Sequence, residues 1–175
     1  MKKVIGRILT VLVCVGVLYV IYAYALPEYP QSIIKGLIQP RINSTANTRI
    51  QEVKNQKCKD VDDLTYEQVF ANVEGSCWVY VTPEKSTDGA EHVIFYGENV
   101  SVNLKDWPDY NGGLMYTSTS VKFDFVIRGN SFDVVPYIDD FKTGLKIYDG
   151  KHEDANNKVR KDVLNQIYSG MRKDQ

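Results

Sequence analysis

The first 26 residues constrain this chain most, because they contain an uninterrupted apolar run. From Ile8 to Leu26 the sequence has nineteen residues without a charge. In a helix that rises about 1.5 Å per residue, a run of this length matches the roughly 30 Å hydrocarbon core of a bilayer. The sequence therefore predicts that residues 1–26 form a transmembrane helix and that residues 8–26 contact the membrane.

Basic residues before the run set its expected orientation. Lys2, Lys3 and Arg7 precede it, and the end of a membrane helix that carries such residues stays in the cytoplasm. A signal-anchor of this kind makes a single-pass protein of the cell membrane, whose C-terminal part is extracytoplasmic, or periplasmic in a Gram-negative bacterium. Amphipathic rings suit the membrane–water interface. The tyrosines expected there are Tyr19, Tyr22, Tyr24 and Tyr29.

The same segment also fits a cleaved signal peptide. Ala23-Tyr24-Ala25 matches the small-x-small pattern of a peptidase site, and cleavage after Ala25 would yield a secreted protein. The length of the apolar run favours the anchor, because signal peptides have cores of only about 7–15 residues. Both alternatives place the folded part outside the cytoplasm.

Three cysteines bear on that compartment. Cys14 lies inside the apolar run, where a free thiol acts as a small hydrophobe. Cys58 and Cys77 remain as an even pair, and such pairs form disulfides in oxidising compartments. The pair lacks the CxxC spacing and the neighbouring histidines of a redox or metal site. We therefore expect a disulfide between Cys58 and Cys77, worth about 3 kcal/mol of stability.

Charge and motifs exclude several function classes. Beyond residue 26 the chain has 18 lysines and arginines against 22 aspartates and glutamates, which gives no electrostatic basis for binding nucleic acid. His92 and His152 have no second histidine or cysteine at ligand spacing. The sequence also lacks GxSxG, SxxK and glycine-rich phosphate loops. We expect no metal, no cofactor and no enzymatic activity.

The remainder divides into a stalk and a domain. Prolines and a thin apolar stripe predict that residues 27–57 are a juxtamembrane stalk, and residues 58–175 are the expected extracytoplasmic α+β domain. Within this domain the best-specified element is a helix at about 65–74. Thr65 is placed to cap its first turn, and Gln68 completes a capping box.

A meander of strands follows this helix. Alternating apolar residues predict strands at 76–82, 91–96, 100–104, 114–128 and 131–138, with Gly129-Asn130 as a two-residue hairpin loop. Pro136 has no N–H to donate, so the last of these strands should run along an edge or end there. An apolar stripe predicts a C-terminal helix at about 152–172. The expected fold is an antiparallel meander of four to five strands covered by two helices.

One loop is the candidate binding surface. Residues 105–113 combine Trp107, Asp109 and Tyr110 with two glycines, and exposed tryptophan and tyrosine are enriched in binding hot spots. The alternative is that Trp107 folds back onto the sheet and the glycines only form a turn.

These features favour a binding protein over an enzyme. The expected function is that of a membrane-anchored extracytoplasmic protein with a protein partner outside the cytoplasm. An accessory subunit of a bacterial envelope, secretion or conjugation machine fits this description, and so does an envelope immunity or inhibitor protein. The alternative is an exported hydrolase or carbohydrate-binding module. Nothing in the sequence indicates whether the chain forms homo-oligomers.

Overall fold

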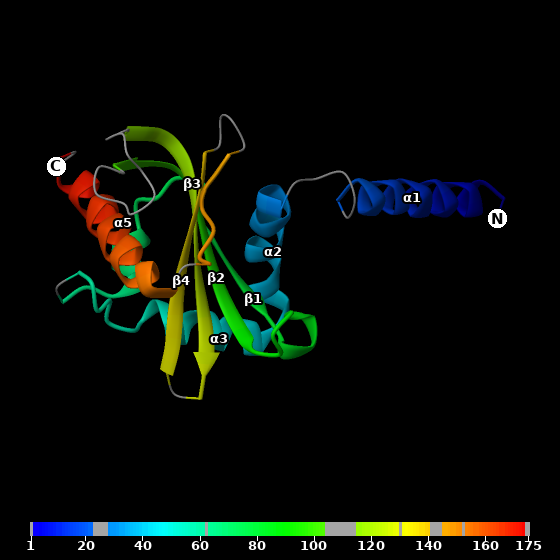
Figure 1. Cartoon of the computed structure of the whole chain (residues 1–175). Helices are drawn as coiled ribbons and strands as arrows, with labels where there is room; N and C mark the ends of the chain where they lie inside the picture. Colours follow the sequence, from blue (N-terminus) through cyan, green and yellow to red (C-terminus); the bar gives the residue numbers. More distant parts are fainter. Residues whose placement is uncertain are drawn as a thin grey trace.

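A five-stranded antiparallel sheet forms the centre of the molecule (Figure 1). The computed structural model describes residues 2–22, 28–61, 63–103, 115–129, 131–140, 145–151 and 153–173. The strands lie in the order β1-β2-β3-β4-β5. Their bounds are Cys77–Val81 for β1, Glu91–Asn103 for β2, Met115–Arg128 for β3, Ser131–Asp140 for β4 and Lys146–Tyr148 for β5. The predicted α+β class and the meander are confirmed.

Helices cover both faces of this sheet. The covering helices are α2 (Glu28–Ile42), α3 (Ser44–Lys54), α4 (Tyr66–Phe70) and α5 (Glu153–Lys173). A further helix, α1 (Lys2–Val20), precedes them in the chain. Figure 1 shows the sheet almost edge-on, with α2 on one side and α5 on the other. Residues of α3, α4 and α5 share one core with the inner face of the sheet. The molecule thus has a helical layer on each face.

The N-terminal helix α1 extends away from the sheet (Figure 1). The large apolar side chains described along it, between Ile8 and Val20, are 54–66% exposed. Among the residues that the structure describes, no helix has the length and apolar character that a membrane crossing requires. The predicted transmembrane helix is therefore not found, although the segment is helical.

Helices α2 and α3 lie in the region expected to be a stalk, and both pack against the sheet. Ala46, Ile50 and Val53 of α3 are buried in the main core. In α2, a Cβ on Gly36 would lie 2.9 Å from the Cβ of Cys77, so this helix contacts β1 directly.

The core of the inner face is rich in aromatic rings. Phe70 of α4 stacks on Phe95 of β2 with 3.9 Å between ring centroids, and Phe123 and Phe125 of β3 are fully buried beside them. Helix α5 packs over this cluster through the apolar stripe predicted for the C-terminal helix. Its buried members are Val159, Val163, Leu164 and Ile167.

Two elements differ from the prediction in extent. The capping box of Thr65 and Gln68 is present, but α4 ends at Phe70. The strands predicted on either side of Gly97 are one continuous strand, β2, with a shift in register between Gly97 and Val100. Asn99 adopts a left-handed conformation there (φ 57°). A bulge of this kind absorbs an extra residue without ending the ladder.

Two glutamine side chains form hydrogen bonds with backbone groups of β1 and β2 at places where no neighbouring strand pairs with them. Gln39 of α2 donates its Nε2 to the Tyr80 carbonyl (2.7 Å), and its Oε1 accepts the Tyr80 N–H (2.9 Å). Gln166 of α5 makes the same pair of contacts with the backbone of Asn103, at 3.4 and 2.6 Å. Unpaired edges invite pairing with other chains, so these amides protect β1 and the end of β2.

Candidate functional site

The structure has no bond between Cys58 and Cys77, which the sequence predicted to form a disulfide. Cys58 and Cys77 are both free and buried. Cys58 lies in the main core, whereas Cys77 packs with Val79 and Tyr96 in a second cluster. Side chains alternate faces along a strand, and this alternation directs Cys77 away from Trp78 and Tyr80, toward α2. The cysteine pair therefore gives no support for an oxidising compartment.

Burial makes both thiols unreactive. It raises the pKa of Cys77 to about 12 and also raises the pKa of Cys58. Because the thiolate is the nucleophile and the metal ligand, neither cysteine is suited to redox or metal chemistry. Among the described residues, no cluster of three or more histidine, cysteine, aspartate or glutamate side chains is placed to hold a metal ion.

The predicted binding loop with Trp107, Asp109 and Tyr110 lies outside the described residues. Of the four interface tyrosines, Tyr19 is 66% exposed at the end of α1 and Tyr22 is half-buried. Tyr24 and the side chain of Tyr29 lie outside what the structure describes.

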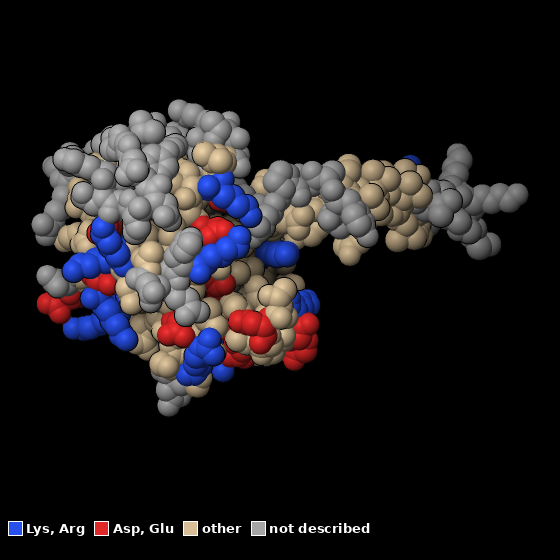
Figure 2. Space-filling model, viewed as in Figure 1, with Lys and Arg blue, Asp and Glu red and all other residues tan. Residues whose placement is uncertain are grey.

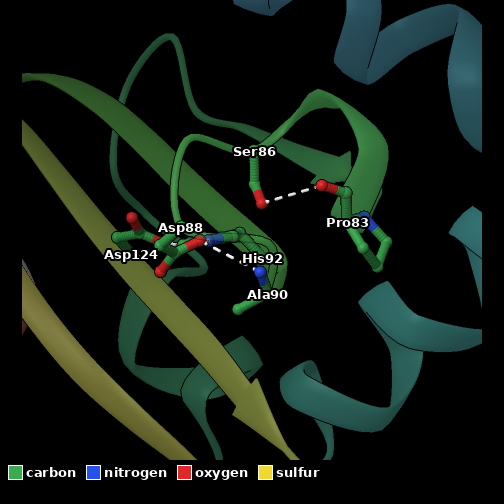
Figure 3. A network of polar contacts seen from close by, with 6 residues as sticks. All are labelled: Pro83, Ser86, Asp88, Ala90, His92 and Asp124. Atoms are coloured by element: carbon green, nitrogen blue, oxygen red, sulfur yellow. Dashed lines mark hydrogen bonds and ion pairs between the residues drawn. The ribbon is translucent and has the colours of Figure 1, made fainter.

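A polar cluster forms around His92 at the start of β2 (Figure 3). Its Nδ1 lies 2.8 Å from Oδ1 of Asp124 on β3, and its Nε2 lies 2.8 Å from Oδ1 of Asp88. The same Asp88 oxygen accepts the Ala90 N–H at 3.0 Å. General acid–base chemistry needs a ring nitrogen within reach of a substrate. Here carboxylates occupy both nitrogens, and the cluster instead fixes the loop before β2.

Titration of this cluster should make stability depend on pH. The hydrogen bond from His92 lowers the pKa of Asp88 to about 2. Burial lowers the pKa of His92, but the bonds with Asp88 and Asp124 outweigh it and raise this pKa above 6.5. A raised folded-state pKa adds stability that is complete below the unfolded pKa and is lost as pH rises through the folded one. The free energy of unfolding should thus fall as the pH rises above about 6.5.

Urea unfolding across this pH range tests the expectation. His92→Gln should flatten the pH dependence, whereas His152→Gln, which changes the only other histidine, should leave it intact. If the free energy of unfolding changed equally with pH in the wild type and in His92→Gln, then His92 would not bind a proton more tightly in the folded state than in the unfolded state.

A groove of about 730 Å³ lies at the outer edge of β4. It is lined by consecutive residues of this strand, from Ser131 to Val135, and by Val126 and Arg128 of β3. The opposite wall comes from α5 and from the chain between α3 and α4. That wall includes Gln56, Lys57, Lys59, Asn156, Asn157 and Arg160. The groove therefore brings together segments that are about a hundred residues apart in the sequence.

The backbone of β4 faces this groove with hydrogen-bonding groups. Arg128 pairs with Ser131 across a two-residue loop, in which Gly129 has φ 62°. Residues that flank such a loop form a hydrogen-bonded pair, and the pairs then alternate along the ladder. The N–H and C=O groups of Phe132 and Val134 consequently point away from β3. Within the described chain, β5 reaches β4 only at Ile138 and Asp139.

Most of the charged side chains that line the groove are ion-paired. Four of its lining residues are cationic, namely Lys57, Lys59, Arg128 and Arg160, against one carboxylate, Asp133. Arg128 pairs with Asp133 at 2.9 Å, and Lys57 pairs with Asp63 at 3.2 Å. Lys59 forms no ion pair among the described residues. Arg160 pairs with Asp60 at 2.6 Å, so three of the four cations that line the groove are already paired with carboxylates.

Sequence reasoning found the edge but missed the groove. Pro136 indicated that this strand runs along an edge or ends there, but β4 continues to Asp140 and pairs with β5 at Ile138 and Asp139. Only the part of β4 before the proline has no strand partner on that side among the described residues. The basic side chains gave no signal, because Lys57, Arg128 and Arg160 come from three segments distant in the sequence. Comparison with protein-family models, with curated proteins and with solved structures finds no match.

Proposed function

We propose that the protein is a membrane-anchored extracytoplasmic binding protein that acts through contacts with another protein. The observation that carries this proposal is the exposure of apolar side chains along α1. Large contiguous apolar surfaces are rare on soluble monomers and mark membrane or protein contacts. The described surface of α1 in Figure 2 is almost free of charged side chains.

The proposed orientation follows from the charges that flank this surface. Lys2, Lys3 and Arg7 precede the apolar run and would stay in the cytoplasm, while the sheet and its helices lie outside. The groove at β4 supplies a surface for a protein partner, because an open strand edge is a common site for peptide recognition. An envelope machine subunit and an envelope immunity or inhibitor protein are the uses that fit. An exported hydrolase or carbohydrate-binding module is the alternative.

Arginine substitutions in the full chain test the anchor. Replacing Leu12 and Val15 together by arginine should release the protein from membranes that are washed with alkaline carbonate. Each arginine costs about 2.5–3.5 kcal/mol at the centre of a membrane helix. The matched control replaces Leu37 and Ile42, two exposed residues of α2, by arginine. This variant should stay in the membrane fraction.

Two results would contradict the anchor. One is recovery of the unaltered full chain in the soluble fraction. The other is a mature N-terminus at Leu26, which would establish cleavage after Ala25 and a secreted protein.

A further inference from the structure

We propose that the outer half of α2 lies on the lipid surface beside the membrane anchor and binds anionic headgroups there. This inference rests on the proposed membrane anchor and names a second surface through which the folded part contacts the bilayer. The outer half of α2 consists of exposed residues with apolar or basic side chains. They are Ile34, Lys35, Leu37, Ile38, Arg41 and Ile42.

The helical period separates this outer half from the half that packs on the sheet. Ser32 is buried, and Ile33 packs against the cluster on the outer face of β1 and β2. Gly36 lies against the backbone of β1, and Gln39 is hydrogen-bonded to the backbone of Tyr80. At about 100° per residue, these four α2 positions share one half of the helix surface. The six outer residues fall on the other half.

Apolar side chains form a stripe along the outer half. Ile34, Leu37, Ile38 and Ile42 are 38–78% exposed, although isoleucine and leucine are among the residues most often buried. Their spacing of three and four positions makes them neighbours on the helix surface. Packing against the sheet does not account for them, because it uses the other half of the helix. A contiguous exposed apolar surface of this kind marks a contact with a membrane or a protein.

Charge favours lipid as the surface that covers this stripe. Lys35 and Arg41 lie beside it, and neither pairs with a carboxylate among the described residues. The only acidic residue of α2 is Glu28, at its start. In helices that lie in the membrane interface, the stems of such cations follow the apolar surface and their charges reach anionic headgroups. A second copy of the chain is disfavoured, because two facing outer halves would bring four cations together.

The position of α2 in the chain places it near the bilayer. Helix α1 ends at Val20 and α2 begins at Glu28, eight positions later. Eight extended residues span at most about 29 Å, so insertion of α1 would keep α2 close to the membrane surface. Figure 1 shows α2 running across the direction of α1 rather than continuing it. This arrangement suits one helix that enters the bilayer and a second that lies along its surface.

Fluorescence quenching in vesicles tests the contact. The full chain carries Cys14→Ala, which leaves only the two buried thiols, and one added cysteine labelled with the dye NBD. The added cysteine is Ile38→Cys or, as the control, Ser169→Cys on α5 at the other side of the sheet. The vesicles contain phosphatidylglycerol and phosphatidylcholine in equal parts, with a nitroxide on some lipid headgroups. We expect the label at position 38 to be quenched at least about threefold more strongly than the label at position 169.

Charge reversals test the role of the cations. Lys35→Glu combined with Arg41→Glu should lower the quenching at position 38 by at least about threefold, because carboxylates are repelled by anionic headgroups. The matched control combines Lys146→Glu with Lys161→Glu, two exposed lysines of β5 and α5, and should leave the quenching unchanged. Vesicles of phosphatidylcholine alone should give the same loss as the first pair of reversals. All variants should still float with the vesicles in a density gradient, because α1 is intact.

The inference is overturned if the chain floats with the vesicles and the label at position 38 is quenched no more than the label at position 169. A label that is shielded from water but not quenched by the nitroxide would show that a protein covers the outer half, and would overturn it too. Equal quenching in neutral vesicles would refute the binding of anionic headgroups. The proposed anchor fails by a different observation, namely a full chain that does not float with the vesicles, and this inference would fail with it.

Discussion

Replacing Phe70 by alanine is expected to lower the free energy of unfolding by about 3–5 kcal/mol. The Phe70 side chain is 2% exposed, and its ring contacts Phe95, Trp78 and Phe123 at centroid distances of 3.9, 5.7 and 5.1 Å. Truncation removes both the buried apolar area and these ring contacts, and it leaves a cavity that neighbouring strands can fill only in part.

Urea denaturation of the full chain measures this loss. The matched control is Ile42→Ala, which truncates a side chain that is 78% exposed at the end of α2 and should change stability by no more than about 0.5 kcal/mol. If the two variants were equally stable, the aromatic cluster would not be the centre of the core.

Local sequence signals predicted the element that carries Phe70. The capping box at Thr65 and Gln68 involves residues three positions apart, and the alternation in the strands concerns neighbouring residues. Both patterns depend only on the nearby chain. The continuity of β2 was missed because a left-handed Asn99 can produce either a turn or a bulge, and pairing with β3 decides between them.

Tertiary contacts account for the larger errors. The apolar stripe of Ala46, Ile50 and Val53 was visible, but the sequence did not show that α3 covers the sheet. For Cys58 and Cys77, spacing allowed a bridge. The disulfide prediction failed because the Cys77 side chain lies on the face of the sheet that α2 covers. The alternation of residues in β1 is visible in the sequence, but it does not show which face of the strand packs against which helix.

The candidate groove could not be predicted from the sequence for the same reason. The stretch of β4 that lines it lies between the hairpin at Gly129 and Pro136, both local features. Its walls depend on α5 crossing beside the segment before α4, a contact between residues about a hundred positions apart. The ion pair that fixes this crossing joins Arg160 to Asp60.

This ion pair gives the second large expected effect. Arg160 donates to both carboxylate oxygens of Asp60, with Nε–Oδ2 at 2.6 Å and Nη2–Oδ1 at 3.2 Å. The two side chains are only 17% and 10% exposed. Removing one partner of a buried pair leaves an uncompensated charge and costs about 3–5 kcal/mol. We expect Asp60→Ala to lie at the lower end of this range.

A double-mutant cycle separates the cost of an orphaned charge from the loss of packing. Arg160→Met removes the cation and keeps much of the side-chain volume, so the double variant with Asp60→Ala should be more stable than Asp60→Ala alone. The control is Asp63→Asn, at an ion pair whose side chains are 77% and 92% exposed, with an expected change below about 1 kcal/mol. A double variant no more stable than Asp60→Ala would mean that Arg160 is not stranded when its partner is removed. Asp60 would then act through the loop that precedes α4, and α5 would be held in place by its apolar stripe alone.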